Sequence, residues 1–155
     1  MTRSILIAVL AIALFGIALA APWDAGSDLH ARGDKTFSTC PGVPNIQTID
    51  SVFISPDQPG QGQLVTITVN AHTPQAIPAD AWMYAQSTGS PDLIPWTICA
   101  AAKKAFPATP CPIPAGPYTF QYSVTLAEGI PVDQTTIQTF GIEVTETLFC
   151  FNFSP

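Results

Sequence analysis

The sequence predicts an all-β sandwich of about seven strands, and three observations support this prediction. Several short stretches alternate apolar and polar residues with a period of two, which is typical of strands with one buried face. Most of the 16 prolines and 10 glycines lie between these stretches, where they favour turns. Only residues 100–106 (AAAKKAF) resemble a helix, of about two turns. Short strands without a long helix favour two packed antiparallel sheets.

The first predicted strand, residues 46–55 (IQTIDSVFIS), ends at a loop rich in proline and glycine. Residues 63–71 (QLVTITVNA) show the clearest alternation, and their β-branched side chains suit a pleated sheet. Residues 118–126 (YTFQYSVTL) place five large side chains on one face, namely Tyr118, Phe120, Tyr122, Val124 and Leu126. The remaining predicted strands are residues 81–86, 93–99, 135–145 and 148–153, the last of them after a turn at Glu146-Thr147.

The N-terminal part of the chain is expected to lie outside this fold. Residues 1–20 combine one positive charge with an apolar run that ends in Ala18-x-Ala20, the pattern of a secretory signal peptide. A membrane anchor is the alternative, because the run is near the lower length for spanning a bilayer. Residues 21–39 lack sustained periodicity and are interpreted as a flexible leader or pro-segment. The folded domain is therefore expected at residues 40–155.

Charge and cysteine content restrict the function. The formal net charge is −6, which argues against nucleic-acid binding. Four cysteines in an exported chain indicate two disulfides, with three possible pairings. A metal site is disfavoured because no C-x-x-C pair occurs and both histidines, His30 and His72, lie far from the cysteines.

No enzyme and no cofactor are expected. The sequence contains no G-x-S-x-G, H-E-x-x-H or glycine-rich phosphate motif. Both histidines are interpreted as loop residues rather than general bases. A pair of carboxylates that only folding brings together, as in glycosidases, stays open at this point.

Four motifs in the last third of the chain carry a family resemblance. They are Cys111-Pro112-Ile113, the alternating strand at residues 118–126, Ile130-Pro131, and residues 148–151 (LFCF). Their order and spacing resemble the ML lipid-recognition domain family. That family includes the Niemann-Pick C sterol carrier and the fungal phosphatidylglycerol/phosphatidylinositol transfer proteins, and the resemblance is closest to the fungal branch. It extends over roughly residues 40–153.

The resemblance implies an immunoglobulin-like topology with a lipid cavity between the sheets. It also implies the disulfides Cys40–Cys150 and Cys99–Cys111. The residues that it places at the lipid, or that share the inward parity of the central strands, are Trp96, Phe120, Val124, Leu126, Ile130, Pro131, Phe140 and Ile142. Aromatic residues on strands usually belong to the core, so some of these side chains are expected to be core residues only.

The function implied by the resemblance is that of a secreted or vacuolar (lysosome-like) monomer. Such a protein carries one phospholipid, phosphatidylglycerol or phosphatidylinositol, or one sterol between membranes, with transient membrane contact. Lys103 and Lys104 either meet a phosphate head group or form a solvated helix face. The alternatives are a lipid-presenting or recognition module without transfer activity, and an adhesion sandwich with a filled core.

Overall fold

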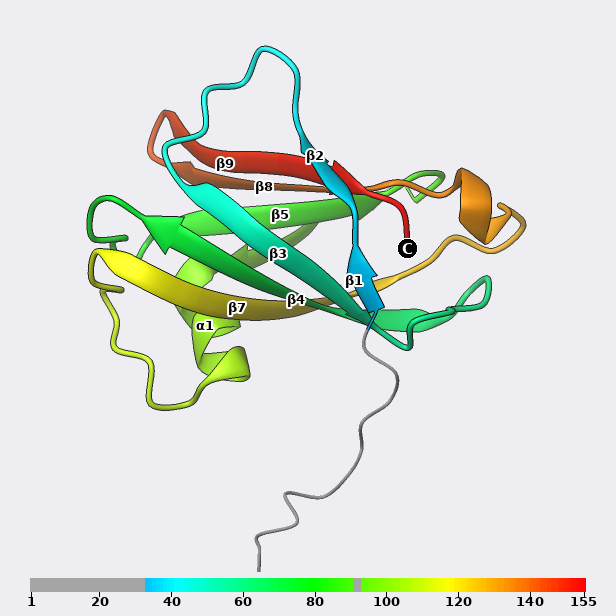
Figure 1. Ribbon diagram of the computed structural model, residues 1–155, viewed down its shortest axis with the longest axis horizontal. Coiled ribbons are helices and arrows are strands. Elements are labelled where there is room, and N and C mark those ends of the chain that lie inside the picture. Colours follow the sequence, from blue (N-terminus) through cyan, green and yellow to red (C-terminus); the bar gives the residue numbers. More distant parts are fainter. Residues whose placement is uncertain (1–32, 91–92) are drawn as a thin grey trace, which may run out of the picture.

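Two antiparallel sheets face each other in the computed structural model, which describes residues 33–90 and 93–155 (Figure 1). The strands of this part of the chain are β1 (Gly33–Lys35), β2 (Phe37–Thr39), β3 (Thr48–Ser55), β4 (Leu64–Thr73), β5 (Trp82–Ser87), β6 (Ile94–Thr97), β7 (Gly116–Thr125), β8 (Ile137–Glu143) and β9 (Glu146–Phe153). One sheet has the order β1-β3-β4-β7 and the other β2-β9-β8-β5-β6. The predicted all-β, immunoglobulin-like sandwich is confirmed, with two short N-terminal strands added.

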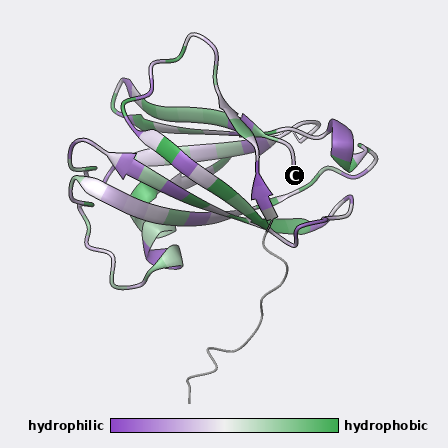
Figure 2. Ribbon diagram, in the orientation of Figure 1, coloured by the Kyte–Doolittle hydropathy of each residue, from purple (hydrophilic) through white to green (hydrophobic). Residues whose placement is uncertain are grey.

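The alternation in the sequence builds the central strand pair of the four-stranded sheet. β4 and β7 pair antiparallel without a register shift, from Leu64 opposite Thr125 to Thr73 opposite Gly116. Because alternate side chains point to opposite faces, one face of each strand enters the core and the other carries polar side chains. Figure 2 shows this change of hydropathy along the strands. The five β7 side chains expected on one face, Tyr118 to Leu126, are all buried.

A short helix, α1 (Ile98–Ala105), follows β6 and packs against β7. It begins where the Thr97 hydroxyl accepts a hydrogen bond from the Ala100 amide at 3.2 Å, an N-cap that satisfies one free backbone donor. For this reason β6 ends at Thr97, two residues before the predicted strand end. The predicted helix is confirmed and begins two residues early. A single turn of 3-10 helix, Val132–Gln134, lies between β7 and β8.

The domain boundary expected at Cys40 is wrong, because residues 33–39 belong to the fold. β1 pairs with β3, and β2 pairs with β9. The Lys35 ammonium binds the Asp57 carboxylate at 3.0 Å, and the Phe37 ring packs edge-on against Phe151 at 6.2 Å. Sequence periodicity missed these strands because each has three residues, too few to show alternation. The predicted signal peptide, residues 1–20, and the leader up to residue 32 lie outside the described residues.

The turn between the last two strands also differs from the prediction. Glu143 pairs with Glu146, so Val144 and Thr145 form the tip, and the predicted turn residues Glu146 and Thr147 begin β9. Val144 has a φ of +53° and is 90% exposed. A tight hairpin requires left-handed backbone at its tip, and here a valine adopts it.

Both disulfides implied by the family resemblance are present. Cys40 is bonded to Cys150, which ties the segment between β2 and β3 to β9. Cys99 is bonded to Cys111, which ties α1 to the segment that leads into β7. The two bridges are therefore on different sides of the sandwich and constrain different loops.

Removing Cys40–Cys150 should destabilise the domain more than removing Cys99–Cys111. The bridges span 110 and 12 residues of sequence. The chain-entropy relation then gives about 5 and about 3 kcal/mol, because the longer loop loses more freedom in the unfolded chain. Thermal or urea unfolding of the two paired Cys→Ser variants measures the difference. An unchanged melting curve for the Cys40/Cys150 variant would contradict the expected role of that bridge.

Phe37→Ala should lower the free energy of unfolding by about 2 kcal/mol, because a half-buried ring is lost from the contact with Phe151. Ser38→Ala is the matched control, since Ser38 lies on the same strand and is exposed. Urea denaturation of both variants gives the two values. Equal stability of the two variants would indicate that β2 does not contribute to the fold and belongs to the flexible leader.

Candidate functional site

The space between the sheets is occupied by a row of aromatic side chains from β7. The rings of Tyr118 and Phe120 stack at 5.7 Å, and those of Phe120 and Tyr122 at 6.2 Å. Phe120 also meets Phe149 of the opposite sheet at 5.4 Å between ring centroids. Such rings are in direct contact, so protein side chains fill the space between the sheets at this level. The open cavity that the resemblance implies is closed here.

A glycine on β8 makes room for the cross-sheet contact. Gly141 lies opposite Phe149 in the β8–β9 pairing, and its inner side is covered by the Phe149 ring. A Cβ at position 141 would come within 2.5 Å of the Phe149 ring. Glycine at this position therefore allows the ring to lie flat over the strand and reach Phe120.

Two neutral hydrogen bonds lie within this apolar interior. The Tyr122 hydroxyl and the Thr139 hydroxyl are 2.5 Å apart, and Thr139 comes from the opposite sheet. The Tyr118 hydroxyl donates to the Gln47 side-chain oxygen. Gln47 is 2% exposed. A buried polar group without a partner is costly, so each tyrosine requires a neighbour of this kind.

Burial raises the pKa of both tyrosines. Desolvation disfavours the charged phenolate of Tyr118 and shifts its pKa strongly upward. The same effect raises the pKa of Tyr122, and the hydrogen bond with Thr139 partly opposes it. Both side chains are consequently neutral donors and acceptors over the whole physiological pH range.

Trp96 covers the side of the sandwich at which β6 of one sheet faces β7 of the other. β6 and β7 are the outermost strands of their sheets on this side. The half-buried Trp96 ring meets Tyr122 at 5.5 Å, which joins the two strands through side chains alone. The structure therefore places this predicted residue at the boundary between the interior and the surface.

Most of the other predicted lipid-contacting residues lie between the sheets or at one end of them. Phe120, Val124 and Leu126 are buried, and the Leu126 amide donates to the Gln63 carbonyl beyond the end of β7. Ile130 is partly buried and packs directly over Gly89, while Pro131 is exposed. The loops after β3 and β7 gather at this end, on the right in Figure 1.

The inward parity predicted for Phe140 and Ile142 is wrong. In β8 the buried positions are Ile137, Thr139 and Gly141, so Phe140 points to the outer face. There its ring stacks on Tyr84 of β5 at 5.3 Å. Ile142 pairs with Trp82, a residue that is 43% exposed on the same outer face. These residues are accordingly separated from the interior site by the sheet itself.

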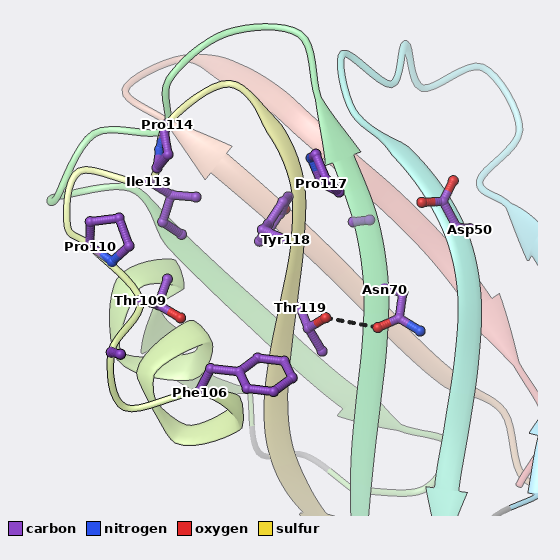
Figure 3. A pocket seen from close by; sticks show the side chains of 12 residues that line it. Asp50, Asn70, Phe106, Thr109, Pro110, Ile113, Pro114, Pro117, Tyr118 and Thr119 are labelled. Carbon is purple, nitrogen blue, oxygen red and sulfur yellow. Dashed lines mark hydrogen bonds between the residues drawn. The ribbon is translucent and has the colours of Figure 1, made fainter.

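A groove that the sequence did not predict lies between the 106–117 segment and the four-stranded sheet (Figure 3). Its volume is about 520 Å³, within the usual range for small-molecule sites. Apolar walls come from Phe106, Pro110 and Ile113, and Tyr118 also lines the groove. The groove and the interior aromatic row therefore share one residue, Tyr118.

Polar side chains on the strands form the other wall of the groove. Thr119 donates to Asn70 at 2.8 Å, and Asn70 donates to Ser51 at 2.9 Å. Asp50 lies at a register shift between β3 and β4, where a bulge changes the direction of a side chain. The proline-rich sequence from 107 to 117 could have predicted a rigid segment on one side of the groove. Nothing in the sequence indicated that β3 and β4 would face it.

The two candidate head-group lysines lie in the last turn of α1 and are exposed. Lys104 donates to the Ser123 hydroxyl on β7 at 3.0 Å. In the part of the chain that the structure describes, no three His, Cys, Asp or Glu side chains gather in a way that could hold a metal ion. Nor does this part contain a helix long and apolar enough to cross a membrane.

Comparisons with known proteins identify the fold. No protein-family model and no curated protein sequence matches the chain. Among solved structures, the crystal structure of a Niemann-Pick type C2 protein from the Japanese carpenter ant matches with a TM-score of 0.51 at 12% sequence identity. The match covers 76% of this chain and 96% of that chain. The protein has the Niemann-Pick type C2 fold. The closer resemblance to the fungal branch stays a prediction.

The stability of the protein should fall as the pH rises above about 10. The unfolded chain loses its tyrosine protons near pH 10, whereas buried Tyr118 and Tyr122 keep theirs to higher pH. The native state then binds more protons, so each tyrosine lowers the free energy of unfolding by up to about 1.4 kcal/mol per pH unit. Urea denaturation between pH 8 and 11.5 measures this slope. Tyr118→Phe and Tyr122→Phe should each reduce it, and unchanged slopes would contradict the buried, neutral state of these side chains.

Proposed function

We propose that this protein is a lipid carrier that takes the apolar part of one lipid between its two sheets and moves it between membranes. The observation that carries the proposal is the Niemann-Pick type C2 fold together with an interior row of aromatic side chains. Two disulfides fit an oxidising compartment such as the extracellular space or a lysosome-like lumen.

Uptake of a lipid in this fold requires the sheets to separate, and the energies permit it. Side chains alone join the sheets at Phe120–Phe149 and at Trp96–Tyr122. Each such aromatic contact contributes about 0.5–1.5 kcal/mol beyond its buried area. A chain of about sixteen methylenes gains roughly 13 kcal/mol on burial. The burial of a long acyl chain therefore exceeds these aromatic increments, whereas that of a short chain does not, because association itself costs several kcal/mol.

The end of the sandwich at Leu126 is the proposed mouth. Leu126 is buried at the end of the inward row, and Ile130 and Pro131 form the loop beyond it. Leu64, 60% exposed, begins the neighbouring strand at the same end and supplies apolar surface for a membrane. Phosphatidylglycerol, phosphatidylinositol and sterol are the candidate cargoes. No covalent step is needed for this activity.

Leu126→Phe should reduce lipid uptake at least tenfold without unfolding the domain. The larger ring fills the mouth, at a cost of about 1–3 kcal/mol from overpacking. Thr125→Phe is the matched control, because Thr125 is the adjacent residue and is exposed on the opposite face of β7. Native mass spectrometry after incubation with phosphatidylglycerol, phosphatidylinositol or sterol vesicles measures binding, and labelled-lipid exchange between vesicles measures transfer.

The packed interior also favours a second candidate, a filled-core extracellular sandwich that binds no lipid. Wild-type protein that keeps a bare mass with all three kinds of vesicle would support this candidate and reject the carrier. Binding without exchange would instead indicate a lipid-presenting module. Equal uptake by Leu126→Phe and Thr125→Phe would place the mouth elsewhere.

A further inference from the structure

The strongest unexplained feature of the interior is a buried side-chain amide whose nitrogen makes no hydrogen bond. The Gln47 side-chain oxygen accepts from Tyr118, but the side-chain nitrogen, Nε2, has no partner among the residues that the structure describes. Gln47 is 2% exposed, so the nitrogen is shielded from bulk solvent. A buried donor in this state is costly, and native proteins rarely retain one without a reason.

Main-chain hydrogen bonds to β9 hold Gln47 in place. The Gln47 main-chain amide donates to the Leu148 carbonyl at 2.9 Å, and the neighbouring Ile46 amide donates to the same oxygen at 3.0 Å. Tyr118, which orients the side chain, stacks on Phe120. The Tyr118 hydroxyl requires only the acceptor oxygen of this side chain, so the pairing with Tyr118 does not account for the nitrogen.

The amide lies at the opposite end of the aromatic row from the proposed mouth. Tyr118 and Leu126 are eight residues apart along the same extended segment. At 3.3 Å per residue, this separation corresponds to about 26 Å. Tyr118 also lines the groove of Figure 3, whereas Gln47 does not. The part of a ligand that lies beside Tyr118 is therefore the part that Gln47 can contact.

We infer that Gln47 selects lipids that carry a neutral oxygen acceptor, such as a hydroxyl, ketone or ester carbonyl, in the portion bound beside Tyr118. This inference rests on the proposed lipid-binding function and names the class of cargo. Nε2 is a neutral donor, so it pairs with an uncharged oxygen without the desolvation cost of burying an ion. The interior groups that face this portion, Tyr118, Phe120 and Phe149, carry no charge. A hydrocarbon end at this position leaves the donor unpaired and binds less tightly.

The test compares two probes that differ in a single atom group. 2-Dodecanone carries a ketone, and 2-methyl-1-dodecene replaces its oxygen by a methylene. Displacement of a bound naphthylamine dye gives both dissociation constants for the full mature protein. The preference for the ketone should fall by roughly three- to tenfold in Gln47→Met, the range expected for loss of one neutral hydrogen bond.

Thr139→Val is the matched control. It removes the hydroxyl that pairs with the other buried tyrosine, Tyr122, so it should destabilise the domain to a similar degree. It leaves the Gln47–Tyr118 pair in place and should keep the ketone preference. Comparing the ratio of the two probes within each variant cancels general losses of stability or of cavity shape. A merely structural role of Gln47 would lower the melting temperature of both variants and change the ratio in neither.

The outcomes separate this inference from the proposed function. An equal ketone preference in the wild type and in Gln47→Met would overturn the role of Gln47 while leaving a lipid site. Failure of both probes to displace the dye from the wild type would reject the interior lipid site and the inference with it. Loss of the preference in Gln47→Met alone would support both.

Discussion

The contact between Phe120 and Phe149 is the interaction on which the arrangement of the two sheets depends. Sheets of a sandwich are held together by the side chains between them, and this pair meets across the gap at 5.4 Å. Around it, Tyr118 and Tyr122 stack on one side and Phe151 packs beside Phe149 on the other. This contact therefore contributes to the stability of the fold, and a ligand bound between the sheets, as proposed above, would have to displace part of the cluster.

The interior combines this apolar cluster with neutral polar groups, and this combination affects the chemistry that it supports. Thr139 satisfies Tyr122, and Gln47 satisfies Tyr118. Burial keeps both phenols protonated, so the interior offers hydrogen bonds but no charge. Such an environment suits uncharged cargo that is recognised by shape and by one or two hydrogen bonds. It does not supply an activated nucleophile or a charged base.

The two sides of the sandwich are closed in different ways. On one side the chain itself crosses from β1 to β2, and Cys40–Cys150 fixes the following segment to β9. On the other side Trp96 and α1 cover the boundary between β6 and β7, and Cys99–Cys111 limits how far α1 can move. The ends of the sandwich, by contrast, are closed by loops. Opening at an end therefore breaks fewer constraints than opening at a side.

The sequence alone determined the fold class, the approximate positions of the strands from residue 46 onward and the inward face of β7, because alternation and turn residues are local signals. The family resemblance added both disulfide pairings and the Niemann-Pick type fold. Only the tertiary structure decided the orientation of β8, since its sequence carries apolar residues on both faces. Hydrophobicity alone predicts that Phe140 and Ile142 lie on the buried face of β8. The packed structure instead requires a hydroxyl at Thr139 for Tyr122 and an absent side chain at Gly141 for Phe149. Both requirements come from the opposite sheet or the neighbouring strand, and a pattern within one strand cannot contain them.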